Sequence, residues 1–203
     1  ELRQALPNLG WPPRMSTYMI HFVCVSDVRT VKLYLPAKQA ELDAVLDCLE
    51  VDSWQEVQLE ECDTAMPEMW AFVDMAHTSM EQVNQFAQCL EMLDANGELA
   101  AFKAVASQLD IYKLEDAMAL TEHLSEYAYE PSIHSLEDRA REELALMADG
   151  PELDLLIRNL NLTAYGADLM YRDRGILSDY GYVHRPDGQP IHLPQQGMDI
   201  TMQ

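Results

Sequence analysis

Acidic residues dominate the middle of this chain, where they are interleaved with apolar residues instead of forming one run. Residues 41–137 contain 22 Asp or Glu and two bases, Lys103 and Lys113, a balance of −20. The flanking segments 1–40 and 138–203 balance at +3 and −5, which brings the net charge to −22. Interleaved charge is typical of the solvent face of folded elements, not of a disordered acidic tail.

This charge excludes several classes of partner, while the 48% apolar content is enough to build folded cores. A strongly negative surface repels phosphate, so we expect no direct binding to nucleic acid or to an anionic membrane. No run approaches the roughly 18 apolar residues that cross a bilayer, and residues 1–15 lack the apolar core of a signal peptide. We therefore expect a cytoplasmic protein that does not contact membranes.

The N-terminal third predicts a small sheet packed on a helix. Residues 18–25 and 31–35 are rich in β-branched and aromatic residues and flank a short polar stretch, which predicts a hairpin. Leu42, Val45, Leu46 and Leu49 have helical spacing, so a helix is expected over 37–49. Shorter patterns predict one or two further strands, at 54–60 and 69–73.

From Thr78 onward the pattern becomes helical. Ser79 and Gln82 form a capping box, and the apolar stripe that follows continues until Gly97. Further helices are expected over 99–109 and 114–124.

The last third mixes helices with short strands. Ser135 and Asp138 predict the start of a helix that runs to Met147 and is broken by Gly150-Pro151. The remaining segments are expected to form one or two short helices over 152–171 and short strands at 176–177 and 180–184.

Together these patterns predict an α+β fold, and the family resemblance described below implies that it is elongated. Its expected divisions are an extension (1–15), an N-terminal α+β domain with a small antiparallel sheet (16–77), a central helical domain (78–131) and a C-terminal domain of helices and short strands with a tail (132–203).

No motif in the sequence predicts catalysis. G-x-S-x-G, Walker A, G-x-G-x-x-G and H-E-x-x-H patterns are missing, and the four cysteines have no C-x-x-C spacing. Glu130 and His134 are separated by Pro131, which disfavours a shared helical face for a metal. We expect no catalytic residues, metal or cofactor, and a small hydrolase that uses a carboxylate, His123 or His134 is the least favoured hypothesis.

A folded acidic surface has three interpretations. In the first, the acids have no role beyond keeping the protein soluble. In the second, the protein is an acidic adaptor or chaperone, and the acids bind a basic partner. The third is imitation of DNA: duplex DNA carries one charge per about 1.7 Å, so 22 charges correspond to about 40 Å of duplex. Such a protein could occupy a basic DNA-binding cleft without being a substrate.

Several runs in this chain resemble the ArdA antirestriction proteins. The closing segments match that family's "AYGRDL … GxFTxxGYV" pattern in order and spacing, although Ala167 stands where the pattern has arginine. The similar segments are Leu33–Ala37, Val83–Leu93, Phe102–Val105, Leu114–Ala117, Tyr127–Pro131, Leu162–Leu169 and Gly175–Val183. The family's usual opening strand with glycine and tryptophan is not visible, and residues 184–203 extend past its usual end.

The resemblance implies a non-enzymatic protein of mobile genetic elements that imitates bent DNA. It also implies a homodimer formed through the C-terminal domain, and a Type I restriction-modification enzyme, or a related DNA-binding protein, as the partner. The working surface would then be a set of outward carboxylates: Glu41, Asp43, Asp47, Glu50, Asp52, Glu56, Glu60, Glu61, Asp63, Glu81, Glu91, Asp94, Glu98, Glu115, Asp116, Glu122 and Glu126.

Overall fold

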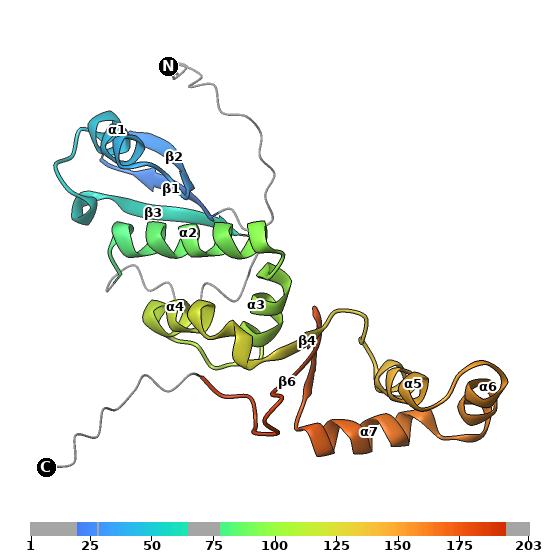
Figure 1. The fold of residues 1–203 in the computed structure, drawn as a ribbon. Coiled ribbons are helices and arrows are strands. Elements are labelled where there is room, and N and C mark those ends of the chain that lie inside the picture. Colours follow the sequence, from blue (N-terminus) through green and yellow to red (C-terminus); the bar gives the residue numbers. More distant parts are fainter. Residues whose placement is uncertain (1–19, 28, 65–77, 194–203) are drawn as a thin grey trace, which may run out of the picture.

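Two small antiparallel sheets with helices between and beyond them form an elongated α+β fold (Figure 1). The computed structural model describes residues 20–27, 29–64 and 78–193. The order of elements is the expected one, with a sheet and helix first, then helices, then helices with short strands. The extension 1–15, the strand predicted at 69–73 and the tail after Leu193 lie outside the described residues.

The N-terminal sheet confirms the predicted hairpin. Strands β1 (Ile20–Val25) and β2 (Thr30–Leu35) pair antiparallel, with Ile20 opposite Leu35 and Val25 opposite Thr30. Strand β3 (Gln58–Thr64) pairs with the other side of β1, which gives the order β2-β1-β3. The strand predicted at 54–60 starts later than expected, because Trp54–Glu56 form a short 3₁₀ turn, η1.

Helix α1 (Gln39–Leu49) buries Leu42, Val45 and Leu49, as its apolar stripe predicts. The hairpin turn caps its C-terminus: Arg29 donates from Nη1 to the carbonyl of Cys48 at 3.0 Å, and the Ser26 hydroxyl donates to the carbonyl of Leu49 at 3.0 Å. These bonds satisfy carbonyls that the helix itself leaves without a partner.

The central helices are α2 (Met80–Asn96), α3 (Leu99–Ala106) and α4 (Leu114–Glu122). The predicted capping box is present, because the Ser79 hydroxyl accepts the Gln82 N–H at 3.2 Å and the Gln82 side chain accepts the Ser79 N–H at 2.9 Å. Gly97 ends α2 in the left-handed conformation, with φ of 76°.

The C-terminal region contains one strand that the sequence did not predict and one helix start that was predicted incorrectly. Strand β4 pairs with β6, which is the middle strand of a sheet ordered β4-β6-β5. Gly150 and Pro151 begin a helix instead of breaking one, since proline suits a first helical turn; the break lies at Ala148 and Asp149. The elements are η3 (Leu124–Glu126), β4 (Ala128–Glu130), α5 (Leu136–Met147), α6 (Gly150–Asn159), α7 (Leu162–Asp173), β5 (Ile176–Ser178) and β6 (Gly181–His184).

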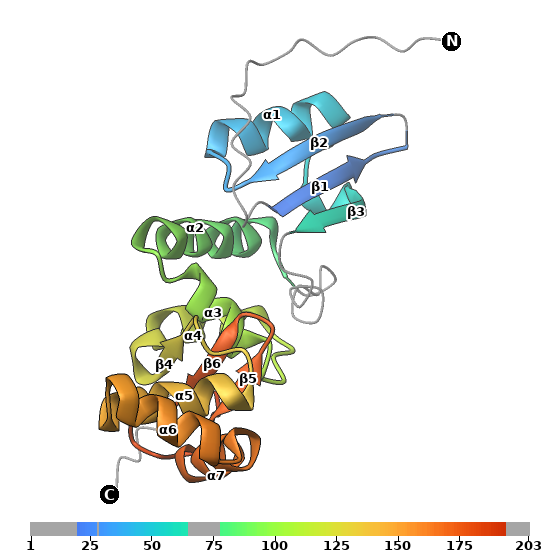
Figure 2. The same ribbon diagram turned by 90° about the vertical axis from the view of Figure 1, so that its right-hand side faces the viewer.

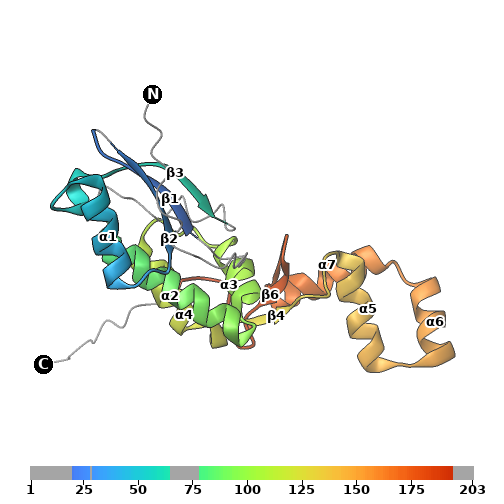
Figure 3. The same cartoon turned by 90° about the horizontal axis from the view of Figure 1, so that it is seen from above.

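The molecule divides into a body and an arm. One hydrophobic cluster runs from Ile20 to Tyr127 and joins the N-terminal sheet, α1 and the central helices; we call residues 20–127 the body. Helices α5, α6 and α7 (136–173), which we call the arm, project from one end of it (Figures 1 and 3). The buried arm residues Ala140, Leu144 and Leu169 are not part of the body cluster.

Candidate functional site: the acidic surface of the body

The predicted carboxylates face outward wherever their side chains are described. Most are exposed, and Glu41, Glu91, Asp116 and Glu126 are half-buried. Glu60, Glu61 and Asp63 belong to β3, where only the backbone is described. The exposed carboxylates are Asp43, Asp47, Glu50, Asp52, Glu56, Glu81, Asp94, Glu98, Glu115 and Glu122.

These carboxylates are distributed along the body. Helices α1, α2 and α4 follow one another down its length, as Figures 1 and 2 show, and each carries several of the acids. Helix α1 carries Asp43 and Asp47, α2 carries Glu81 and Asp94, and α4 carries Glu115. The acids therefore extend over both the N-terminal unit and the central helices.

A buried amide clamp fixes the N-terminal unit to α2. Asn84 accepts the Ala37 N–H at 2.7 Å and donates to the Ala37 carbonyl at 2.9 Å. Ala37 lies two residues before Gln39, the first residue of α1, so the clamp ties the start of α1 to the N-terminal part of α2. Because the two units also share one hydrophobic cluster, the acids on α1 and α2 keep a fixed relation to each other.

The two lysines of the acidic segment interrupt its surface very little. Lys103 is 9% exposed, with its ammonium 6.0 Å from the centre of the Tyr180 ring, so it is directed into the protein. Lys113 is exposed at the start of α4. Burial of Lys103 thus leaves the face of the body more acidic than the sequence count alone indicates.

Two carboxylates of the predicted set bind arginines of the same chain. Glu50 accepts a hydrogen bond from Arg29 at 2.5 Å, with both side chains about half exposed. Glu126 binds Arg185 at 3.0 Å and His123 at 2.8 Å, and hydrogen bonds from these two residues, Arg185 first, lower the pKa of Glu126. These internal partners make Glu50 and Glu126 less available to a second protein.

The described residues show no arrangement typical of a catalytic centre. Within the described ranges, no group of three or more His, Cys, Asp or Glu could hold a metal ion. A cavity of about 500 Å³ at the end of α7 is lined by Met170, Tyr171, Arg172, Arg174 and Gly175, with no His, Asp, Glu, Lys or Cys among these residues. The ring of His123 contacts Glu126 through Nδ1, whereas in His134 it is the backbone N–H that donates to Asp138.

An apolar surface on the arm escaped the sequence analysis. Leu146 and Met147 at the end of α5 are 79% and 68% exposed, and Leu155 on α6 is 64% exposed. Helix α6 has no buried residue at all, although half of its side chains are apolar. A helix of ten residues is not stable alone and needs an apolar contact. The leucines and the isoleucine of this segment could therefore have indicated a face that packs against a partner.

In the part of the chain that the structure describes, no helix has the length and apolar character needed to cross a membrane. A scan against protein-family models and a search of curated proteins both found no match.

Proposed function

We propose that this chain is an antirestriction protein, an acidic DNA mimic that occupies the DNA-binding path of a Type I restriction-modification enzyme. One observation carries the proposal: exposed carboxylates follow α1, α2 and α4 along a body with a single continuous core. The ArdA-like segments of the sequence point to the same class of protein.

The physical basis is electrostatic. A cleft built for DNA is lined with Lys and Arg, and a rigid row of carboxylates can pair with them where phosphates normally do. Rigidity matters because a flexible acidic chain would lose conformational freedom on binding. The Asn84 clamp and the shared core supply that rigidity before the partner arrives.

The target's DNA should compete directly with this protein. The test is binding of the purified full chain to a Type I enzyme, in the presence of increasing amounts of its recognition duplex, with DNA cleavage and methylation measured in parallel. Displacement by DNA and loss of cleavage support the proposal. Joint binding of DNA and the chain to one enzyme would contradict it and favour the acidic adaptor or chaperone.

Matched sets of neutralised acids test which surface is used. Asp43→Asn, Asp47→Asn and Asp94→Asn remove three charges from the body. The control removes three exposed charges outside it, with Glu142→Gln, Asp168→Asn and Asp179→Asn. Exposed pairs contribute about 0–1 kcal/mol each, so the body set should weaken inhibition about tenfold and the control set hardly at all. Equal effects would mean that only the net charge matters.

The proposed assembly is a homodimer formed through the C-terminal domain. Its support is an exposed apolar surface on α5, on α6 and just after α6, formed by Leu146, Met147, Leu155 and Leu160. A second copy of the chain carries the same surface, so a two-fold contact would cover both at once. Like charge on the two copies opposes this contact, so the attraction would come from the apolar side chains of the arm.

A further inference from the structure

Strand β6 lies between the hydrophobic cluster of the body and buried residues of the arm. Successive residues of a strand face opposite sides, and Val183 belongs to the body cluster while its neighbour Tyr182 does not. Tyr182 lies instead against residues of the arm: the Arg139 guanidinium carbon is 5.7 Å from the centre of its ring. The arm therefore meets the sheet through a polar and aromatic junction, not through a shared apolar core.

Arg139 is the centre of this junction. Only 8% exposed, it donates from Nη2 to Asp173 at 2.7 Å and from Nη1 to Glu143 at 3.1 Å, which links α5 to the end of α7. Tyr182 is fully buried and so close to Gly175 that a β-carbon there would lie 2.1 Å from the hydroxyl. Residues of α5, α7, the α7–β5 turn and β6 thus meet at one point.

Two buried polar atoms of the junction make no hydrogen bond to any residue that the structure describes. They are Nε of Arg139 and the hydroxyl of Tyr182. Buried polar atoms in folded proteins are nearly always paired, so two such atoms at one junction are unusual. The two side chains nevertheless face each other, since the guanidinium lies over the ring.

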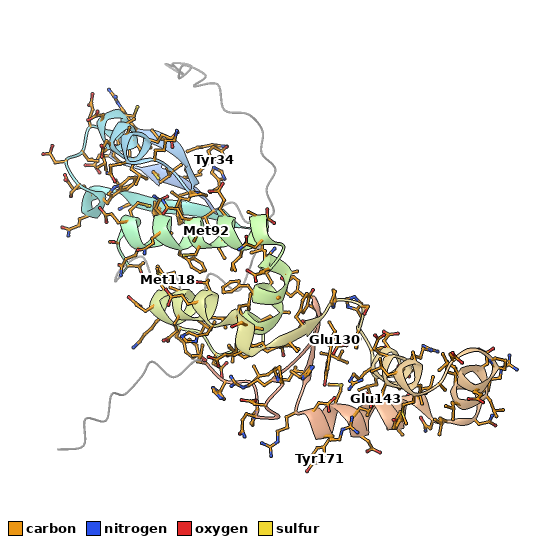
Figure 4. The ribbon with its side chains drawn as sticks, in the orientation of Figure 1. Tyr34, Met92, Met118, Glu130, Glu143 and Tyr171 are labelled. Carbon is orange, nitrogen blue, oxygen red and sulfur yellow. The ribbon has the colours of Figure 1, made fainter. Side chains whose placement is uncertain are left out.

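We infer that Arg139 and Tyr182 are positioning residues, which set the angle between the arm and the acidic body. The inference rests in part on the proposed function: if two copies join through their arms, this angle also sets how the two acidic surfaces are inclined. Figure 4 shows side chains at this narrow connection, where Glu130 lies on the body side and Glu143 on the arm side.

Small-angle X-ray scattering of the full chain tests the inference by measuring the distribution of interatomic distances. Light scattering determines the oligomeric state of each sample. Tyr182→Leu removes the ring over which the Arg139 guanidinium lies, and Arg139→Met keeps the chain length and removes the guanidinium. The expected result is a broader distribution of interatomic distances at unchanged helix content. Arg158→Met and Tyr171→Leu are matched controls on exposed arm residues, and they should reproduce the parental curve.

Inhibition supplies the second readout. The concentration needed for half-inhibition should rise about tenfold in Tyr182→Leu, equivalent to about 1.4 kcal/mol, although no acid has been removed. Parental scattering curves from both junction variants would overturn the inference, and Tyr182→Leu decides alone if Arg139→Met does not fold. If the parental chain inhibits no restriction enzyme, the proposed function fails, while the scattering comparison still judges the junction.

Discussion

At the scale of single residues, the glycines of the ArdA-like closing segments permit close packing of the backbone. A β-carbon on Gly166 of α7 would lie 1.9 Å from the carbonyl oxygen of Leu136 in α5. At Gly175 the same atom would meet the Tyr182 hydroxyl. The two positions let α7 approach α5 and the turn after α7 approach β6, so these residues are structural rather than members of a binding site.

Gly166→Ala should therefore destabilise the arm. The added methyl group meets backbone, which cannot rotate away, so α5 and α7 must separate at a cost of about 1–3 kcal/mol. Urea denaturation of the full chain, followed by circular dichroism, measures the loss. Ala167→Ser, at the exposed neighbouring position of α7, is the control and should change stability by no more than about 0.5 kcal/mol. Equal losses in both variants would contradict the packing argument.

Tyr182 should titrate at high pH. Burial, followed by the charge of Asp173, raises the pKa of Tyr182 to about 12 from a usual value of 10.0. A folded-state pKa above the unfolded one means that the stabilising contribution is complete below pH 10 and is lost between about pH 10 and 12. Ultraviolet difference spectra should show one tyrosinate signal near pH 12 that Tyr182→Phe removes. A Tyr182 signal near pH 10 would mean that the junction is open to water.

At the scale of elements, the Asn84 clamp joins two units that the sequence presents as separate patterns. Asn84→Ala leaves the buried N–H and carbonyl of Ala37 without their partner, which should cost about 2–4 kcal/mol. The measurement is the urea midpoint of the full chain. Gln85→Ala, at an exposed neighbouring position of α2, should change stability by no more than about 0.5 kcal/mol. A comparable effect of the two substitutions would show that the clamp contributes nothing specific.

The exposed face of α6 should hold two copies of the chain together. Leu155→Glu places a charge on this face without disturbing a buried contact, since Leu155 is 64% exposed. Sedimentation velocity should show a dimer for the parental chain and a shift toward the monomer for the variant. Tyr112→Glu, on the body and 69% exposed, is the matched control and should leave the dimer intact. A parental chain that sediments as a monomer would contradict the proposed assembly.

At the scale of the whole molecule, the sequence predicted what local patterns determine. The hairpin, the stripe of α1 and the Ser79 capping box depend on neighbours in the chain, and all three are present. Strand β4 was not predicted, because three residues become a strand only by pairing with β6 more than fifty positions later. The Glu126–Arg185 ion pair spans 59 positions and was invisible for the same reason. The apolar stripes of the helices were enough to predict that the acids face outward. The order of these acids along the body depends on how the helices pack, which local patterns do not determine.

Salt should act in opposite directions on folding and on binding. The net charge of −22 makes the folded chain repel itself, and ions screen that repulsion over about 10 Å at 0.1 M. The melting temperature should rise with sodium chloride, by about 2–4 °C for each kcal/mol of repulsion removed. Binding to a basic cleft should weaken at least about tenfold between 50 and 200 mM salt, because the same ions screen the attraction.

Measuring melting temperature and inhibition in one salt series separates this electrostatic mechanism from ordinary loss of structure. A chain that unfolded in salt would lose both properties, whereas here the fold becomes more stable as inhibition declines. Sucrose is the matched control, since it stabilises the fold through exclusion from the surface and leaves charges unscreened. It should raise the melting temperature and preserve inhibition. Inhibition that is indifferent to salt would show that apolar contacts, not the carboxylates of α1, α2 and α4, hold the partner.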